Sequence, residues 1–240
     1  MNESNQDPLA QQDRKSIKIT GEQVHTIIEW LSWADKDYVA ARRLLLDGLL
    51  VQGASLANTA IEKYLKASIV CQGKKVKRGH DPLTIYRQMK SDCTLQLNEK
   101  FLALLAKAYK LRYPDDLEAG YNIVLSQALI LDALDQSVKL ITSRIVIANS
   151  SDGHAVVRLL DNLIAQNDPR VVFNNTALGT VTKDALLDQP SLVYECRVIQ
   201  KHSYMEAEYS AARIENGNFD REALVQTSEK SFNLANTPTQ

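Results

Sequence analysis

An arginine and a tyrosine stand together just before a proline, in the segment Arg112-Tyr113-Pro114. Proline cannot continue a helix and the residue before it favours an extended backbone, so we expect both side chains to project from a helix end into a loop. A guanidinium offers phosphate a planar fork, and a phenol ring offers a nucleobase a flat face. The segment therefore indicates a binding site for a nucleotide or RNA. In the alternative interpretation, Arg112 pairs with Asp115 or Asp116 and the segment only ends a helix.

A second candidate string runs from Arg197 to His202, with four residues between the arginine and the histidine. Cleavage of RNA by its own 2′-hydroxyl needs a base and a cation near the phosphate, which these two residue types could supply. The chain has four histidines, and so short a motif also arises by chance. Catalysis at this pair is therefore the less favoured of two interpretations.

The strongest local positive charge lies in one predicted loop, at Lys74, Lys75, Lys77 and Arg78. Phosphate contacts from this basic cluster would give salt-sensitive binding without sequence selectivity. No aromatic residue is interleaved with these side chains, so the loop does not resemble a platform for stacking single-stranded bases. The alternative interpretation is a solvated loop without a ligand.

Composition excludes several classes of function. The chain is 45% hydrophobic and 24% charged, with a formal net charge of −1, so any attraction to nucleic acid must come from a local patch. Its three cysteines, Cys71, Cys93 and Cys196, show no C-x-x-C spacing, which predicts a cytoplasmic protein without a metal site. We find no apolar run long enough for a membrane segment and no hydrophobic leader. The sequence also has no Walker loop, HExxH or GxSxG motif, and we expect no cofactor.

Apolar periodicity predicts that the candidate residues are held by a helical bundle built around residues 54–71. One face of this central helix is apolar or small, and the opposite side is polar, with Asn58, Thr59, Glu62, Lys63 and Lys66. The helix before it begins near Gly21. We expect its outer face to carry Lys36, Arg42, Arg43 and Asp47. Glycines at 48 and 53 mark a short turn between these two helices, which predicts an antiparallel pair.

Later helices have local start signals. Asp81 followed by Pro82 predicts the N-cap and first residue of a third helix, and Asn98 predicts the N-cap of a fourth. A fifth, long helix is expected from about Tyr121 to Ile147, because apolar residues recur there at helical spacing.

The predicted fold class is an all-α bundle of about five helices with a small C-terminal appendage of α+β or mixed type. We divide the chain into a mobile tail over residues 1–21, the bundle over 22–148 and the appendage over 149–240. In the appendage, residues 154–166 could form a helix. Residues 192–214 are rich in valine, isoleucine and tyrosine, and their alternation slightly favours strands over a long helix.

The sequence motifs of the bundle, and their order, resemble the HEPN family, the higher eukaryotes and prokaryotes nucleotide-binding domain. Four segments carry the resemblance, in this order: WADKDYVAARRLL, ANTAIEKYLKASIVCQG, GHDPLTIY and AYKLRYPDD. Together they span about Trp33 to Asp116, and the ordered set is more specific than any one segment. The resemblance implies an all-helical domain, and it does not extend beyond about Ile147.

Two kinds of function follow from this resemblance. Many HEPN proteins are metal-independent endoribonucleases, often toxins, with an R-x4-6-H motif and an active site composed across a dimer. Others lack the motif, and are thought to bind nucleotides or to pair with a small nucleotidyltransferase in toxin–antitoxin-like systems. Arg112 stands where the family has its R-Y-P triplet, but no histidine follows within the required window. We therefore expect a non-catalytic, homodimeric binding module for a nucleotide, RNA or a nucleotidyltransferase partner.

Two alternatives remain. One is an active ribonuclease with a divergent site, for which Arg197 and His202 are the candidate residues. The other is a structural protein-interaction domain whose appendage carries the specificity.

The resemblance also extends the candidate ligand site, which then comprises Arg112, Tyr113, His80, Asp81, Glu62 and Lys63. The family keeps polar residues at the position of Glu62 and Lys63, where they would line a groove. His80 lies beside the electropositive end of the third helix. In the alternative interpretation, Glu62 and Lys63 form a solvated face and His80 only braces its loop.

Overall fold

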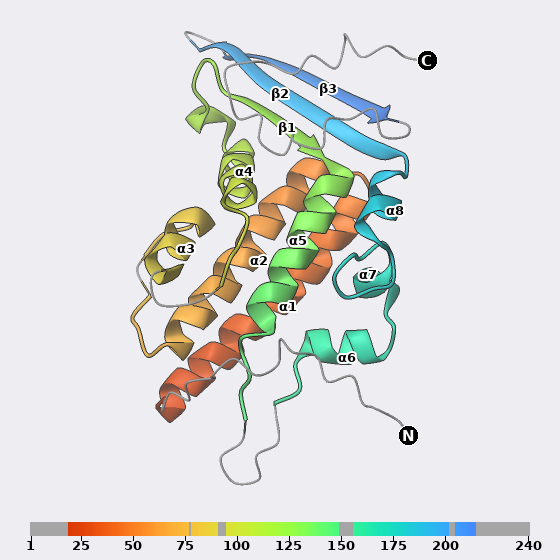
Figure 1. The fold of residues 1–240 in the computed structure, drawn as a ribbon. Coiled ribbons are helices and arrows are strands. Elements are labelled where there is room, and N and C mark those ends of the chain that lie inside the picture. Colours follow the sequence, from red (N-terminus) through yellow and green to blue (C-terminus); the bar gives the residue numbers. More distant parts are fainter. Residues whose placement is uncertain (1–18, 77, 91–94, 149–155, 202–204, 215–240) are drawn as a thin grey trace.

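The computed structural model describes residues 19–76, 78–90, 95–148, 156–201 and 205–214. Its centre is the antiparallel pair α1 (Gly21–Leu46) and α2 (Leu50–Cys71), shown in Figure 1. Helices α3 (Pro82–Lys90) and α4 (Glu99–Tyr109) pack against α2, and α5 (Gln127–Thr142) contacts both central helices. The predicted fold class is confirmed. None of the helices in these described ranges is both long and apolar enough to cross a bilayer.

The helices begin where local capping chemistry allows it. Asp81 accepts a hydrogen bond from the Leu83 amide at the start of α3, and Asn98 accepts from two amides at the start of α4. Both predicted N-caps are therefore confirmed. At the junction of α1 and α2, a Cβ atom on Gly53 would lie 2.6 Å from Cγ of Leu45. Only glycine allows the two helices to approach so closely there.

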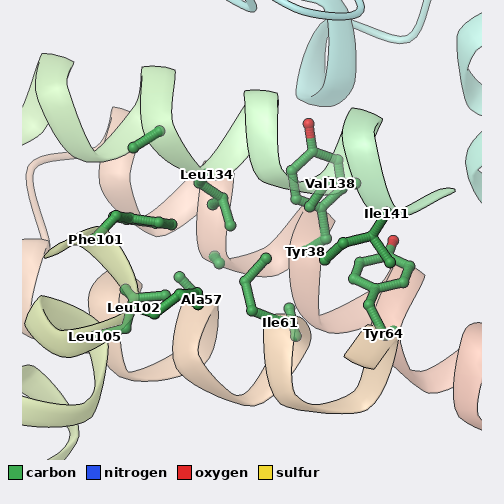
Figure 2. Packing of buried hydrophobic residues seen from close by; sticks show 14 of the residues in the cluster. Tyr38, Ala57, Ile61, Tyr64, Phe101, Leu102, Leu105, Leu134, Val138 and Ile141 are labelled. Carbon is green, nitrogen blue, oxygen red and sulfur yellow. The ribbon is translucent and has the colours of Figure 1, made fainter. Parts of the chain in front are cut away.

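The core of the bundle is apolar and contains buried tyrosines, among them Tyr38 and Tyr64 (Figure 2). Tyr38 of α1 and Tyr64 of α2 are completely buried, as are Phe101 of α4 and Leu134 of α5. The predicted apolar face of α2 lies in this core. The opposite, polar face of α2 is also largely buried, so the alternative interpretation of Glu62 as part of a solvated face is wrong. There, Asn58, Glu62 and Lys66 are 0%, 5% and 6% exposed.

The prediction of one long helix over residues 121–147 is wrong. Residues Asn122–Ser126 form strand β1, and α5 occupies only Gln127–Thr142. Ile123 and Leu125 are buried in the main core, whereas Val124 packs against Val193 in a second small cluster. A short apolar run buried on both sides is typical of a strand that other segments cover.

β1 is one edge of a three-stranded antiparallel sheet in the order β1-β2-β3. Its partners are β2 (Ser191–Lys201) and β3 (Met205–Ile214), and in this register Ile123 lies opposite Cys196. The preference for strands over residues 192–214 is therefore confirmed. The expected helix in residues 154–166 is present as α6 (Leu159–Ala165), and α7 (Pro169–Val172) and α8 (Lys183–Leu187) follow it.

The C-terminal segments share the core of the bundle. Leu160, Val171, Leu186 and Cys196 belong to the same hydrophobic cluster as the residues of α1, α2, α4 and α5. Nothing in the fold tests the division into separate units at residue 149, so that boundary stays a prediction. Residues 1–18 of the predicted tail lie outside the described residues.

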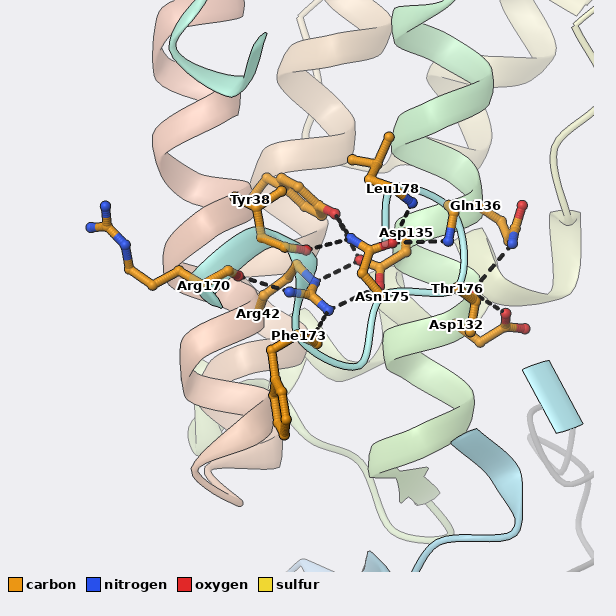
Figure 3. Close-up of polar contacts among 12 residues, drawn as sticks. Tyr38, Arg42, Asp132, Asp135, Gln136, Arg170, Phe173, Asn175, Thr176 and Leu178 are labelled. Carbon is orange, nitrogen blue, oxygen red and sulfur yellow. Dashed lines mark hydrogen bonds and ion pairs between the residues drawn. The ribbon is translucent and has the colours of Figure 1, made fainter. Parts of the chain in front are cut away.

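A buried polar network joins α1 and α5 to the C-terminal segment (Figure 3). The prediction that Arg42 lies on the outer face of its helix is wrong, because Arg42 is completely buried. Its guanidinium donates to the Asp135 carboxylate at 2.8 and 3.2 Å, and to the carbonyl oxygens of Arg170 and Phe173 at 2.7 and 2.9 Å. Tyr38 donates to the same carboxylate at 2.8 Å. We call these contacts the Arg42 network.

A second set of contacts lies nearer the N-terminus of α1. The Asp35 carboxylate accepts from Tyr64 of α2 at 2.7 Å and from the Arg158 guanidinium at 3.0 Å. It also accepts from the backbone amide of Leu160 at 3.2 Å, at the start of α6. Asp35, Tyr38 and Arg42 follow one another at helical spacing, so one stripe of α1 contacts the C-terminal segment between residues 158 and 175.

Candidate functional site

Arg112 and Tyr113 lie where α4 ends. A 3-10 turn, η2 (Lys110–Arg112), follows α4, and Pro114 opens a second one, η3 (Pro114–Asp116). Tyr113 between them has φ −128° and ψ 78°, outside the helical region, in keeping with the restriction that a following proline imposes. Both side chains are exposed, as the sequence predicted, and Tyr113 is 48% exposed.

Arg112 lies against two tyrosine rings. Its guanidinium carbon is 4.9 Å from the ring centre of Tyr109 and 5.6 Å from that of Tyr113, and the two rings meet edge to face at 6.2 Å. Within the described part of the chain, Arg112 forms no ion pair with Asp115 or Asp116. The two rings orient the guanidinium by cation–π contacts and leave its N–H groups available to an anion.

A buried carboxylate lies beneath the loop that leads into α3. Glu62 of α2 accepts a hydrogen bond from Lys66 at 2.5 Å, one helical turn away. The same carboxylate lies 3.2 and 3.3 Å from Nδ1 of His80. Asn58, one turn earlier on α2, donates to the backbone carbonyl of His80 at 3.2 Å. Asn58 and Glu62, one helical turn apart, thus hold the loop at His80 in place, and the His80 side chain remains 73% exposed.

Tyr109 links these two groups of residues. Burial raises the pKa of its hydroxyl, the nearby charge of Arg112 lowers it, and Tyr113 and Glu62 raise it further. The end of α4, with Tyr109, and the turn η2, with Arg112, both pack against α2, the helix that carries Glu62. We call Glu62, His80, Tyr109, Arg112 and Tyr113 the α2–α4 site.

The α2–α4 site combines groups that suit a phosphate attached to a nucleoside. Arg112 can donate two parallel hydrogen bonds to phosphate oxygens, and the exposed ring of Tyr113 offers a stacking face. When Nδ1 of His80 donates to Glu62, its Nε2 is left as an acceptor that points away from the carboxylate. The site can therefore bind an anion, and His80 has the geometry of a base.

Two predicted site residues have other partners. Lys63 pairs with Asp37 of α1 at 2.5 Å and lies 5.5 Å from the ring centre of Trp33, so it faces α1 and does not line a groove with Glu62. Asp81 caps α3, as described above, and its other carboxylate oxygen accepts from Thr84 at 2.5 Å.

The basic cluster lies in the loop just before His80. Lys74, Lys75 and Arg78 are exposed, and Lys77 lies outside the described residues. This loop can contribute positive charge next to the α2–α4 site.

The pair Arg197 and His202 lies on another part of the fold. Arg197 is on β2, where its Nε donates to Glu195 at 2.7 Å. His202 lies outside the described residues, so the structure does not test this pair.

Sequence reasoning missed three members or supports of the site. Tyr109 precedes Arg112 by three residues, which places the ring and the cation on one helical face. Asn58 and Lys66 recur every four residues with Glu62, and this regular polar stripe could have indicated a functional face on α2. The described residues contain no group of three or more His, Cys, Asp or Glu side chains that could hold a metal ion.

Comparison with known families gives one match. A family model described as the HEPN domain matches residues 27–142, which contain the whole α2–α4 site. No curated protein and no solved structure matches the chain.

Proposed function

Residues 27–142 form a HEPN domain, and on this premise we propose that the chain binds a nucleotide, free or within RNA, at the α2–α4 site without cleaving it. One observation carries the proposal: an exposed guanidinium is oriented by two tyrosine rings at the end of α4. A cation fixed in this way has already lost much of the rotational freedom that binding would otherwise cost it.

The charges around the site support an anionic ligand. Lys74, Lys75 and Arg78 lie in the loop that precedes His80, and Lys110 is exposed in the same turn as Arg112. The buried carboxylate of Glu62 is neutralised by Lys66 and contacted by His80, so it does not repel a phosphate as an unpaired charge would. Contacts of this kind are sensitive to salt and independent of sequence.

Fluorescence anisotropy with a labelled single-stranded RNA of about ten nucleotides tests the proposal. Arg112→Ala should weaken binding by about 1–3 kcal/mol, or roughly 5- to 150-fold, through the loss of a charge-assisted hydrogen bond. Tyr113→Ala should cost a similar amount through lost stacking. Arg144→Ala is the matched control, because Arg144 is an exposed arginine beyond the end of α5. Equal affinities for Arg112→Ala and Arg144→Ala would refute the assignment.

His80 favours a second candidate function, metal-independent RNA cleavage. With Nδ1 held by Glu62, Nε2 could take the proton from a ribose 2′-hydroxyl while that oxygen attacks the adjacent phosphorus. The bond to the 5′-oxygen would break, that oxygen would take up a proton, and a 2′,3′-cyclic phosphate would remain. The histidine would then come from the loop before α3, in place of the one absent after Arg112.

A cleavage assay separates the two candidates. The leading proposal predicts intact RNA after incubation with the wild-type protein, with or without divalent metal. Release of 2′,3′-cyclic phosphate ends that His80→Ala abolishes would establish the second candidate instead. Cleavage that His80→Ala leaves unchanged but His202→Ala abolishes would support the pair Arg197 and His202, and cleavage that neither variant changes would point to a contaminating nuclease.

A further inference from the structure

A cavity of about 370 Å³ lies on a different part of the fold, between the end of α1, the start of α5 and the C-terminal segment. Its volume lies in the range of small-molecule sites. Much of its lining comes from residues after 142, in α7, α8 and the sheet, beyond the family match. The cavity is therefore a feature of this chain in addition to its HEPN domain.

Three arginines line this cavity, each from a different element: Arg43 of α1, Arg170 of α7 and Arg213 of β3. Asp47 is the single carboxylate in the lining. Arg213 is exposed and forms no hydrogen bond or ion pair with any described residue. An excess of guanidinium groups over carboxylates in a concave site attracts anions.

The two other arginines keep donors for a ligand. Arg43 uses only its Nε on Asp47, and this pair is largely exposed, at 65% and 44% of the two side chains. Arg170 uses Nε and Nη2 on Asp168 and keeps Nη1. The exposed pair of Arg43 and Asp47 contributes little to stability, so a phosphate group can compete for the Arg43 guanidinium.

The rim of the cavity also offers an aromatic face. Phe173 is 58% exposed, and Figure 3 shows its ring pointing away from the Arg42 network, which binds only its backbone. An exposed phenylalanine beside guanidinium groups provides a stacking surface for a planar ring. The rim carries amides too, since Asn174 donates to Gln189 at 3.0 Å across it.

The walls of the cavity are held rigidly. Gln127 donates to the carbonyl of Leu45 at 2.6 Å and accepts from the amide of Leu192 at 3.2 Å, which fixes the end of α1 to the start of β2. On the other side, the Arg42 network fixes the backbone at Arg170 and Phe173. A site formed by braced elements needs little reorganisation to accept a ligand.

We propose that this cavity is a second ligand site, which binds a nucleoside phosphate. The guanidinium groups hold the phosphates, Phe173 stacks on the base, and the amides at the rim contact its edge. This inference does not depend on the α2–α4 site, because none of its residues belongs to that site.

Isothermal titration calorimetry of the full-length protein with ADP tests the inference. Arg213→Gln and Phe173→Ala should each weaken ADP binding by about tenfold, since they remove a charge-assisted contact and a stacking face. Arg144→Gln, at an exposed arginine outside both the cavity and the α2–α4 site, should leave this binding unchanged. Thermal melting of each variant checks that the fold is intact, and Arg43→Gln offers a second variant at the cavity should one of the others fail to fold.

Titrations with inorganic phosphate, adenosine and an oligoglutamate peptide identify the ligand class. ADP should bind more tightly than phosphate or adenosine alone, because only ADP engages both the guanidinium groups and the ring. Three results would overturn the inference: no ADP binding, ADP binding that Arg112→Ala abolishes while Arg213→Gln does not, or binding of the peptide without binding of ADP. The second result would leave the proposed function standing, so failure of the two proposals is distinguishable.

Discussion

Arg42→Met would remove the cation at the centre of the Arg42 network. The side chains of Arg42 and Asp135 are both 0% exposed, so the substitution leaves a carboxylate buried without its cation. It also leaves the carbonyl oxygens of Arg170 and Phe173 without the donors they have now. Breaking a buried pair in this way costs about 3–5 kcal/mol. That is a large share of the roughly 5–15 kcal/mol by which most domains are stable.

The same substitution should change how stability depends on pH. Burial raises the pKa of Asp135 to about 7, while the charge of Arg42 acts in the opposite direction. In the unfolded chain an aspartate loses its proton near pH 3.9. Between these values the folded protein holds a proton that the unfolded chain has lost, so stability falls as pH rises from about 4 to 7. Without Arg42 the folded pKa lies higher, and we expect the decline to continue above pH 7.

Urea unfolding followed by circular dichroism at several pH values measures both effects. Arg43→Met is the matched control, because the neighbouring arginine forms only an exposed pair with Asp47, and it should cost less than about 1 kcal/mol. Adding Asp135→Asn to Arg42→Met should restore part of the loss, since no buried carboxylate then remains. The reasoning would be refuted if Arg42→Met matched Arg43→Met in both midpoint and pH profile.

Three further predictions concern the fold and assembly. The predicted boundary at residue 149 can be tested with a chain that ends at residue 148. Contrary to a division into separate units, we expect this chain to lose its cooperative thermal transition in circular dichroism, because β1 loses its partner strand and Arg42 loses its carbonyl acceptors; a melting temperature close to that of the full chain would support the boundary instead. Gly53→Ala should lower the free energy of unfolding by about 1–3 kcal/mol, because its Cβ would lie 2.6 Å from Leu45. An unchanged urea midpoint would contradict this. Light scattering should report a homodimer that Trp33→Ala weakens, because this tryptophan is 52% exposed; a monomer at every concentration would exclude it.

Local chemistry made several elements predictable. Asp81 with Pro82, and Asn98, mark the first residues of α3 and α4, because an N-cap acts within a few residues. Both caps are present as expected. The turn between α1 and α2 was marked by Gly48, which has φ +81°, whereas Gly53 lies inside α2. The projection of Arg112 and Tyr113 followed from the proline next to them, because proline acts on its immediate neighbours.

Elements that depend on distant segments were not predictable in the same way. The run at Ile123 to Leu125 suits a helix or a strand equally, and only pairing with β2, about seventy residues later, decides between them. Arg42 and Arg43 are identical in type and adjacent in sequence, yet one is buried and the other exposed. Asp135, the partner that makes the difference, lies 93 residues away.

The α2–α4 site falls between these two cases. Arg112 and Tyr113 could be singled out from one short segment, and the family resemblance directed attention to Glu62 and His80. The contact between Glu62 and His80 depends on how the loop before α3 folds back onto α2, which no local signal specifies. Periodicity also indicated the polar side of α2 but not its burial, because it separates two faces of a helix without showing which neighbours cover them.

The arrangement of α1 decides how the binding proposals must be tested. Asp35, Tyr38 and Arg42 lie inside the family match at residues 27–142, but their contacts reach Arg158, Arg170, Phe173 and Asn175 beyond it. A fragment cut to the family match would leave this stripe of buried polar groups without partners, at a cost of about 1–3 kcal/mol for each unsatisfied group. If such a fragment did not bind RNA, the cause could equally be an unfolded chain or a missing site. Only single substitutions in the full chain, such as Arg112→Ala against Arg144→Ala, can separate the two.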